Sequence, residues 1–320
     1  MSDNQIIRQA AEIIKRGGIV AFPTETVYGL GADAFNPLAV ARIFEVKRRP
    51  YFDPLIVHVA SPSNVEELAK EIPSNVKKLI ERFWPGPLTM VLLRKENIPD
   101  IVSAGLPTVA IRMPNHPMAL ALIIECRCPI AAPSANPFGY LSPTTADHVR
   151  EQLGGQVDLI LDGGPCPVGV ESTILSFLEE KPRLLRPGGV PLEEIESIMG
   201  KVEISPIEEK PSAPGMLLRH YAPRTPIVLD WDKKDLHFYE DKKIGLLVLQ
   251  KPKNNVQFHS VEVLSKKGDL REAAANLFSA IRRLDALNLD LIVAEPITEV
   301  GLGRAIMDRL RRATSKWEQI

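Results

Sequence analysis

The stretch IVAFPTETVYGLGADA (19–34) places a short apolar segment, IVAF (19–22), directly before a polar segment that contains glycines. The apolar segment predicts a buried strand. The polar segment offers the hydroxyl groups of Thr24, Thr26 and Tyr28. Ligands of α/β sheets collect at the ends of strands, so these hydroxyls are candidate ligand contacts. Taken alone, the segment is more typical of an ordinary loop between a strand and a helix.

Helix and strand patterns alternate on both sides of this stretch. Before it, apolar residues recur at helical spacing, and Gly17 and Gly18 are expected to end that helix. After it, Asn36 and Pro37 are suited to the cap and first turn of a helix that runs to about Lys47. Further strands are expected at 55–59, 88–94, 108–113, 129–132, 157–161 and 172–177, and further helices at 117–126 and 191–200. Residues 1–200 are therefore predicted to form a mixed α/β domain with one sheet.

Residues 201–226 differ in composition, with five prolines and little periodicity, and are predicted to be a linker. Strand patterns at 226–230, 244–249 and 289–296 then alternate with helix patterns near 269–287 and 303–316. This alternation predicts a small Rossmann-like α/β domain with a parallel sheet over 227–320.

The overall composition excludes several classes of protein. The chain has 320 residues, of which 45% are hydrophobic and 25% charged, with a formal net charge of −1. There is thus no general attraction to nucleic acid or to an anionic membrane, and no apolar run long enough to span one. The three cysteines form no C-x-x-C pair, and the first 18 residues resemble an amphipathic helix more than a signal peptide, so a cytoplasmic location is expected. The sequence contains no P-loop motif and no G-x-G-x-x-G motif.

Two cationic positions are candidates for anion binding. Lys47, Arg48 and Arg49 lie at the end of a predicted helix in KRRPYFDPLIVH (47–58). Such charges usually interact with the helix dipole, but guanidinium groups also grip phosphates. Arg112 follows three apolar strand residues, where an unpaired buried charge is costly. It must therefore face either a bound anion or an internal ion-pair partner, and the two alternatives remain equally open.

Two further loops combine hydroxyl groups, glycines and charges. The segment APSANPFGYLSPTTADHV (132–149) crowds Ser, Thr and Asn side chains in front of a predicted helix, where backbone amides also bind phosphate. Capping by Thr144 or Thr145 explains only some of them. The segments DGGPCPVGVESTI (162–174) and LLRPGGV (184–190) are glycine-rich turns, and the second carries Arg186.

In combination and in this order, these motifs resemble the YrdC/Sua5 family. The motifs are PTETVYGLGADA, KRRP with PLIVH, FWPGPLT, VAIRMPNHP, APSANPFGYLSPTTADHV, DGGPCPVGVESTI and LLRPGG. The linker phrase SAPGMLLRHYAP (212–223) and the domain after it resemble the longer Sua5 type, so the resemblance covers nearly the whole chain. It implies a YrdC-like mixed twisted sheet and L-threonylcarbamoyladenylate synthase activity. Such an enzyme is a nucleotidyltransferase that forms threonylcarbamoyl-AMP and pyrophosphate from ATP with Mg2+, L-threonine and bicarbonate or CO2.

The resemblance also implies partners and site residues. A downstream threonylcarbamoyl-transferase complex would use the product to modify tRNAs that read ANN codons, with at most weak tRNA contact by this chain. The implied threonine site consists of Thr26, His58, Arg112, the backbone of Ala132, and Ser172. The implied ATP site consists of Arg49, Asp53, Thr108, Ser134, Ser142, Arg186 and Tyr221, with Lys47 and Asn136 as neighbours. No covalent catalytic residue is implied: Lys47 and Arg49 are candidates for neutralising charge, and no metal ligand is assigned.

Asp53 departs from the family pattern, which often has Asn at this place, and a carboxylate near phosphates needs a magnesium ion or a ribose hydroxyl as partner. The linker, through His220 and Tyr221, is predicted to close over the site as a lid, and the linker rather than the body of the C-terminal domain is predicted to be what the active site needs. Two other functions are weighed. An RNA-binding module is disfavoured by the net charge and by an aromatic content of 6%. A carbamoyl-phosphate enzyme would bring zinc-finger cysteines, which the chain lacks.

Overall fold

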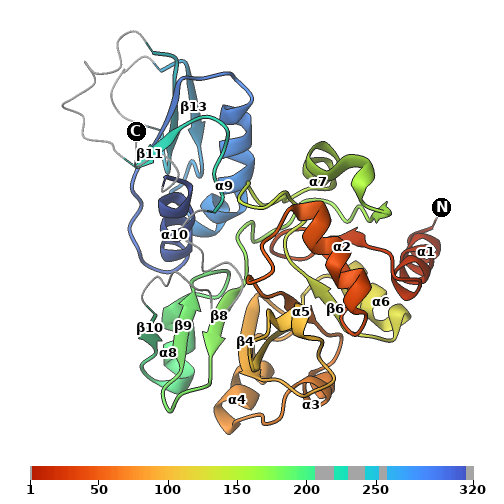
Figure 1. Cartoon of the computed structure of the whole chain (residues 1–320). Coiled ribbons are helices and arrows are strands. Elements are labelled where there is room, and N and C mark those ends of the chain that lie inside the picture. The colour runs from red at the N-terminus through yellow and green to blue at the C-terminus, as the bar shows by residue number, and fades with distance from the viewer. Residues whose placement is uncertain (1, 206–219, 230–241, 252–257, 315–320) are drawn as a thin grey trace.

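The structure is a computed structural model that describes residues 2–205, 220–229, 242–251 and 258–314. Within these residues the chain forms a large mixed sheet and a smaller parallel sheet, each covered by helices (Figure 1). The mixed α/β architecture and the second, parallel sheet confirm the predicted fold class.

The large sheet has ten strands in the order β10-β9-β8-β4-β5-β3-β6-β2-β1-β7. Its pairings are mixed: β3 runs parallel to β5 and antiparallel to β6, and β1 runs antiparallel to β2. The strands are β1 (Val20–Phe22), β2 (Gly29–Asp33), β3 (Ile56–His58), β4 (Leu88–Leu93), β5 (Thr108–Arg112), β6 (Ile130–Ala132), β7 (Leu159–Ile160), β8 (Thr173–Ser176), β9 (Arg183–Arg186) and β10 (Glu203–Ile204).

Helices pack on both faces of this sheet. Successive strand residues point to opposite faces, so Ala21 joins one apolar cluster and Phe22 another. α1 and α6 pack in the cluster of Phe22, whereas α2, α4, α7 and α8 pack in the cluster of Ala21. The helices are α1 (Asp3–Lys15), α2 (Pro37–Lys47), η1 (Pro62–Asn64), α3 (Val65–Leu68), α4 (Ser74–Phe83), α5 (Asp100–Ser103), α6 (Pro117–Cys126), α7 (Ala146–Leu153), η2 (Gly154–Gln156) and α8 (Leu192–Met199).

The smaller sheet has the strand order β11-β14-β12-β13, and its pairings are all parallel. Figure 1 shows α10 at the boundary between the two sheets, close to β8 and β9. This position lets side chains of α10 reach the larger sheet. The elements are β11 (Ile227–Leu229), β12 (Ile244–Val248), β13 (Ser260–Val263), α9 (Leu270–Asp285), β14 (Leu291–Ala294) and α10 (Gly303–Thr314).

Four strands lie outside the segments predicted to be strands. β2 lies within the polar segment after IVAF, and β9 lies partly within the glycine-rich turn 184–190. β10 lies within the predicted linker 201–226, where it extends the large sheet beside β9, and β13 lies in a segment with no predicted element. In β2 the glycine is needed for packing, because a Cβ on Gly31 would lie 2.6 Å from Ile130 Cγ2 and 2.7 Å from Phe22 Cε1. Glycine inside a strand often marks a place where another group approaches closely. The prediction of a simple loop over 23–34 was therefore wrong for its second half.

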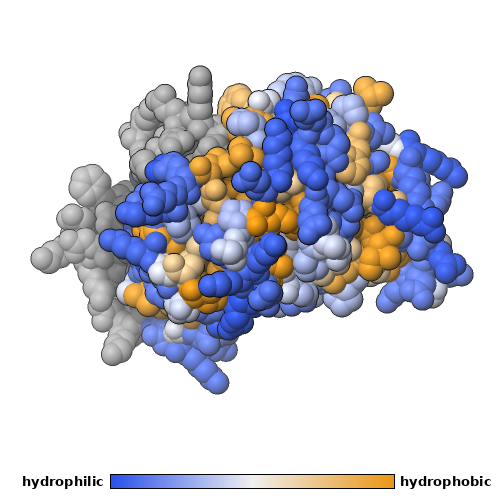
Figure 2. All heavy atoms as spheres, turned by 90° about the horizontal axis from the view of Figure 1, so that it is seen from below, coloured by the Kyte–Doolittle hydropathy of each residue, from blue (hydrophilic) through white to orange (hydrophobic). Residues whose placement is uncertain are grey.

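The surface is mainly hydrophilic on the face that Figure 2 shows, and hydrophobic residues there form patches interrupted by hydrophilic ones. A folded chain exposes much apolar area in this dispersed form. Among the described residues, none of the helices has the length and apolar character that crossing a membrane requires.

The start of α2 gives a direct test of the capping prediction. Asn36 Oδ1 accepts hydrogen bonds from the backbone N–H groups of Leu38 and Ala39, each at 3.1 Å. We expect Asn36→Ala to lower the free energy of unfolding by about 1 kcal/mol, because both donors lose their acceptor. Urea unfolding measures the loss. Asn36→Asp keeps an acceptor oxygen and should keep most of the stability; equal losses in both variants would contradict the capping role.

Candidate functional site

A pocket lies where β2, β3, β5 and β6 meet the loops before β8 and the segment at His220 and Tyr221. Every residue of the implied threonine set lines it, together with Arg49, Ser134, Arg186 and Tyr221 of the implied ATP set. Side chains from distant parts of the sequence therefore face one cavity. The remaining lining residues are Thr24, Val27, Gly29, Ile56, Pro133, Glu171 and His220.

The turn after β1 is fixed by its own hydroxyl groups. Thr24 Oγ1 donates a hydrogen bond to the carbonyl oxygen of Val27 (2.6 Å) and lies 2.9 Å from Thr26 Oγ1. All three side chains are buried, but the Tyr28 hydroxyl donates to the Gly164 carbonyl oxygen at 2.8 Å. Thr24 and Thr26 thus belong to the pocket wall, whereas Tyr28 joins this turn to the loop that follows β7.

Arg112, at the end of β5, forms a buried ion pair with Glu25. Its Nη2 lies 2.7 Å from Glu25 Oε1, and both side chains are less than a tenth exposed. Glu25 Oε2 accepts a further hydrogen bond from the backbone N–H of Asn115 at 3.0 Å. The internal ion pair, one of the two alternatives left open by the sequence, is therefore present. Arg112 also lines the pocket, so its guanidinium can meet a ligand carboxylate as well.

His58 pairs in register with Arg112 across β3 and β5. Its ring stands edge-on to Phe22 with centroids 5.8 Å apart, and Nδ1 lies 3.2 Å from the Ile56 carbonyl oxygen. Burial, and then the nearby charge of Arg112, lower the pKa of His58 to about 3. A neutral imidazole therefore stands beside Arg112 at physiological pH, where it adds no charge and can form hydrogen bonds.

The cationic cluster after α2 divides into residues with separate roles. Lys47 is buried, and its Nζ donates to the carbonyl oxygens of Ser134 (2.5 Å) and Asn136. Arg49 donates to the carbonyl oxygens of Asp53 (3.0 Å) and Pro54 (2.8 Å), and its Nη2 lies 2.8 Å from Asp53 Oδ2. Burial, followed by the charge of Arg49, lowers the pKa of Lys47. Lys47 thus holds the loop at 134–136, while Arg49 reaches the pocket.

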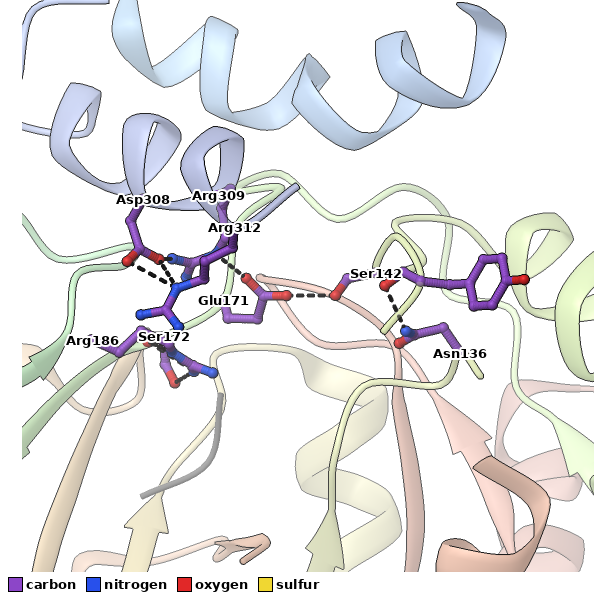
Figure 3. Close-up of polar contacts among 9 residues, drawn as sticks. Asn136, Ser142, Glu171, Ser172, Arg186, Asp308, Arg309 and Arg312 are labelled. Atoms are coloured by element: carbon purple, nitrogen blue, oxygen red, sulfur yellow. Dashed lines mark hydrogen bonds and ion pairs between the residues drawn. The ribbon is translucent and has the colours of Figure 1, made fainter. Parts of the chain in front are cut away.

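Glu171 lies at the centre of a second buried network, drawn in Figure 3. Ser142 Oγ donates to Glu171 Oε1 at 2.5 Å, and Arg309 Nε of α10 donates to Glu171 Oε2 at 2.6 Å (Figure 3). Burial by itself raises the pKa of Glu171, but the charges of Arg309 and Arg186 outweigh it and lower this pKa to about 2. Glu171 therefore stays ionised. Arg186 Nη2 donates to the carbonyl oxygen (3.0 Å) and to Oγ (3.2 Å) of Ser172.

The described end of the linker packs into the pocket wall. Tyr221 is buried, with its ring centroid 4.0 Å from that of His220 and 5.5 Å from that of Phe278 on α9. The backbone N–H of Ala222 donates to the Gly139 carbonyl oxygen at 2.9 Å. This placement is what a lid would need. Residues 212–219 of the linker phrase lie outside the described residues.

Known proteins match nearly the whole chain. Residues 12–188 match the Sua5/YciO/YrdC family, described as "Telomere recombination", and residues 190–315 match a family described as "Threonylcarbamoyl-AMP synthase, C-terminal domain". The threonylcarbamoyl-AMP synthase of Pyrococcus abyssi is 46% identical over 96% of this chain and 94% of its own length. The Bacillus subtilis enzyme of the same name is 44% identical over 96% and 92%. The chain belongs to the Sua5/YciO/YrdC family.

A solved structure of the family has the same fold. The crystal structure of Pyrococcus abyssi Sua5 complexed with L-threonine superposes with a TM-score of 0.91 and covers 98% of this chain and 95% of that one, at 46% identity. The recognition of the long Sua5 type from the sequence motifs is thereby confirmed, because both parts of the chain are matched.

Five residues implied by the family motifs do not line the pocket, but four of them support it. Lys47 and Asn136 hold the loop at Ser134, Asp53 pairs with Arg49, and Ser142 donates to Glu171. Thr108 is different: it begins β5, four residues before Arg112, which at about 3.3 Å per strand residue places it roughly 13 Å away.

Three functional candidates were missed by the sequence reasoning: Glu25, Glu171 and Arg309. Each carboxylate stands among hydroxyl residues, in Thr-Glu-Thr (24–26) and Glu-Ser-Thr (171–173). A carboxylate in a loop otherwise suited to anions is a signal that a cation lies nearby. Arg309 gives no such signal, since it is one of several arginines on a basic helix.

The low pKa of His58 predicts that the folded protein loses stability as the pH falls. The unfolded chain takes up a proton near the ordinary pKa of 6.5, whereas folded His58 does so only near 3, so stability is lost as the pH falls through this window. Between pH 6.5 and 5 the loss from this residue should be roughly 2 kcal/mol. Urea unfolding of the parent and His58→Gln should show a difference that shrinks by that amount on acidification. Substitution of the exposed His259 is the matched control, and a parallel pH dependence in all three proteins would contradict the assignment.

Proposed function

We propose that this chain is an L-threonylcarbamoyladenylate synthase, which forms threonylcarbamoyl-AMP and pyrophosphate from ATP, L-threonine and bicarbonate or CO2. The observation that carries the proposal is the single pocket in which Arg112, Thr26 and Ser172 face the arginines Arg49 and Arg186. One group of side chains suits an amino acid and the other suits phosphates. The names of the full-length relatives support the same activity.

The reaction has two steps that this pocket can serve without a covalent enzyme intermediate. The amine of threonine attacks CO2 and loses a proton, which gives a carbamate. A carbamate oxygen then attacks the α-phosphorus of ATP, and the bond to the β-phosphate oxygen breaks, so that pyrophosphate leaves. Nucleotidyl transfer of this kind depends on positioning and on neutralisation of charge. Arg49 and Arg186 are proposed to neutralise the phosphates, with Lys47 fixing the loop at Ser134.

Threonine is proposed to bind with its carboxylate on Arg112, and its hydroxyl and amine among Thr26, His58, Ser172 and the backbone of Ala132. The neutral His58 suits this arrangement, because its imidazole offers a hydrogen bond without repelling an ammonium group. Ser172 Oγ lies 2.7 Å from Thr89 Oγ1 and is held by Arg186, so its orientation is fixed before a ligand arrives.

ATP is proposed to bind along Arg49, Ser134, Arg186 and Tyr221, with Ser142, Asn136, Asp53 and Thr108 as more distant supports. Magnesium would enter with the triphosphate as part of the substrate. Among the described residues, no group of three or more His, Cys, Asp or Glu could hold a metal ion, and the Asp53 carboxylate is paired with Arg49. The donor set thus fits an ion held mainly by phosphate oxygens and water.

Three further points are part of the same proposal. The domains are residues 1–200 for catalysis, 201–226 as linker and lid, and 227–320 as the C-terminal Sua5 domain. The product is passed to a threonylcarbamoyl-transferase complex for N6-threonylcarbamoyladenosine formation in tRNA. The location is the cytoplasm, and a weak direct contact with tRNA is compatible with the net charge of −1.

An assay of pyrophosphate release tests the proposed reaction. With ATP, Mg2+, threonine and bicarbonate, the protein should release pyrophosphate and form a threonine-containing adenylate that chromatography resolves. Omitting threonine or bicarbonate should abolish both signals. Valine should react much more slowly than threonine, because buried hydroxyl partners would be left unpaired. Pyrophosphate release that does not depend on threonine and bicarbonate would refute the function. Binding of tRNA without pyrophosphate release would favour the RNA-binding module.

A test of the role of Arg112 requires a variant that does not leave the Glu25 carboxylate without its ion-pair partner. Arg112→Gln alone would leave a buried, unpaired carboxylate and would destabilise the fold. The double variant Glu25→Gln/Arg112→Gln removes both charges together. We expect it to weaken threonine binding, measured by calorimetry, by about 2–5 kcal/mol. Glu25→Gln alone is the control. It leaves Arg112 without its carboxylate and so lowers the stability of the free protein, but the carboxylate of threonine can then take the place of Glu25, and threonine affinity should be at least that of the parent. Equal affinity in the single and double variants would show that Arg112 is structural.

A further inference from the structure

Glu171 is an unexpected residue for a pocket that takes a triphosphate. It lines the pocket together with Arg49 and Arg186, it is less than a tenth exposed, and its low pKa keeps it ionised. A buried carboxylate in such a place repels phosphate oxygens unless a fixed positive charge compensates it. Identifying the residue that compensates Glu171 therefore shows what the nucleotide site depends on.

Arg309, which lies 138 positions further along the chain on α10, makes the closest ion pair with this carboxylate. Its Nε lies 2.6 Å from Glu171 Oε2, and its side chain is fully buried. Figure 3 shows Arg309 descending from α10 toward Glu171, whose other oxygen meets Ser142. The same guanidinium lies over the ring of Tyr221, 5.2 Å from its centroid. One side chain of the C-terminal sheet unit thus touches two residues that line the pocket.

The neighbours of Arg309 hold it in this position. Asp308 Oδ2 pairs with Arg309 Nη1 and, at 3.0 Å, also accepts from Arg312 Nε one turn further along α10. The backbone carbonyl of Arg312 in turn accepts a hydrogen bond from the N–H of His220 at 3.4 Å. The guanidinium is therefore fixed before any nucleotide binds, which is the condition for an effective electrostatic contribution.

We infer that Arg309 is a positioning residue of the nucleotide site: it neutralises Glu171, so that the catalytic pocket accepts a triphosphate only when α10 is docked. This inference rests on the proposed function, because it takes ATP as the ligand. It gives the body of the C-terminal domain a direct part in the site, in addition to the lid role of the linker.

The alternative is that Arg309 serves only to join the two sheets. Other contacts already serve that purpose at the same interface: Arg304 on α10 lies 3.3 Å from Glu193, and Arg271 lies 3.6 Å from Glu194. Both pairs are partly exposed and neither lines the pocket. Arg304 therefore offers a matched control on the same helix, with the same charge and a carboxylate partner on the other sheet unit.

The test compares Arg309→Met, Glu171→Gln, the double variant and Arg304→Met in the full-length protein. Steady-state pyrophosphate release gives KM for ATP and for threonine, and calorimetry with ATP alone gives nucleotide affinity. We expect Arg309→Met to raise KM for ATP at least about tenfold, with a much smaller change in KM for threonine, because Glu171 then loses its ion-pair partner and keeps only the charge of Arg186 as compensation. Arg304→Met should leave both values unchanged.

Rescue separates an electrostatic role from a structural one. The double variant Glu171→Gln/Arg309→Met removes both charges of this ion pair, so no carboxylate at position 171 is left to repel the phosphates. Its KM for ATP should therefore return to within a few-fold of that of Glu171→Gln. An unchanged KM for ATP in Arg309→Met, or a double variant as impaired as Arg309→Met, would overturn the inference. If Arg309→Met does not fold, the double variant alone tests the inference. ATP affinity near that of Glu171→Gln then supports the inference, and loss of ATP binding overturns it.

The parent protein distinguishes failure of the inference from failure of the proposed function. A parent that releases no threonine-dependent pyrophosphate refutes the function, while the calorimetric comparison of ATP binding still tests Arg309. A parent that is active, alongside an Arg309→Met variant with unaltered ATP binding, refutes only the inference.

Discussion

Buried charge is the constraint on which the region around the pocket depends. Several buried arginines lie in the pocket or against it, and three of them have a carboxylate oxygen within 2.8 Å; the pairs are Arg49–Asp53, Arg112–Glu25 and Arg309–Glu171. Taking such a charge out of water costs several kcal/mol unless its partner and further hydrogen bonds compensate it. The loops that carry these residues are therefore held in place by pairing, because any loop that moves away leaves its partner unpaired.

This pairing also sets how the pocket meets an anion. The carboxylates reduce the positive potential that a chain of net charge −1 can offer a triphosphate. They also keep the guanidinium groups in fixed orientations: Arg49, for example, is held by two carbonyl oxygens in addition to Asp53. Asp53, for which the sequence suggests a magnesium ion or a ribose hydroxyl as partner, pairs with Arg49 in the structure. Fixed donors contribute more to a reaction than mobile ones, since they need no reorganisation when charge develops.

The parts of the fold that could be predicted from the sequence are those with local signals. α6 (Pro117–Cys126) has a proline at its first position and is itself an apolar run. α2 begins directly after its cap, Asn36. Neighbouring residues therefore determine where both helices start. β2 has no such signal, because its glycines are there to fit Phe22 and Ile130, which lie elsewhere in the sequence. Nine of the site residues implied by the family motifs line the pocket. The combination of several motifs carries information about which distant segments meet, which a single loop does not.

Ion pairs between distant segments could not be predicted from neighbouring residues, although these pairs contribute most of the charge at the site. Arg112 is 87 positions from Glu25 and Arg309 is 138 from Glu171, so nothing near either arginine reveals its partner. Tyr221 shows the consequence: its ring contacts Phe278 and Arg309 of the C-terminal sheet unit while it lines the catalytic pocket. A displacement of α10 would move the charge on Glu171 and the packing of Tyr221 together. The same buried side chains thus form part of the pocket wall and part of the contact with the C-terminal sheet unit.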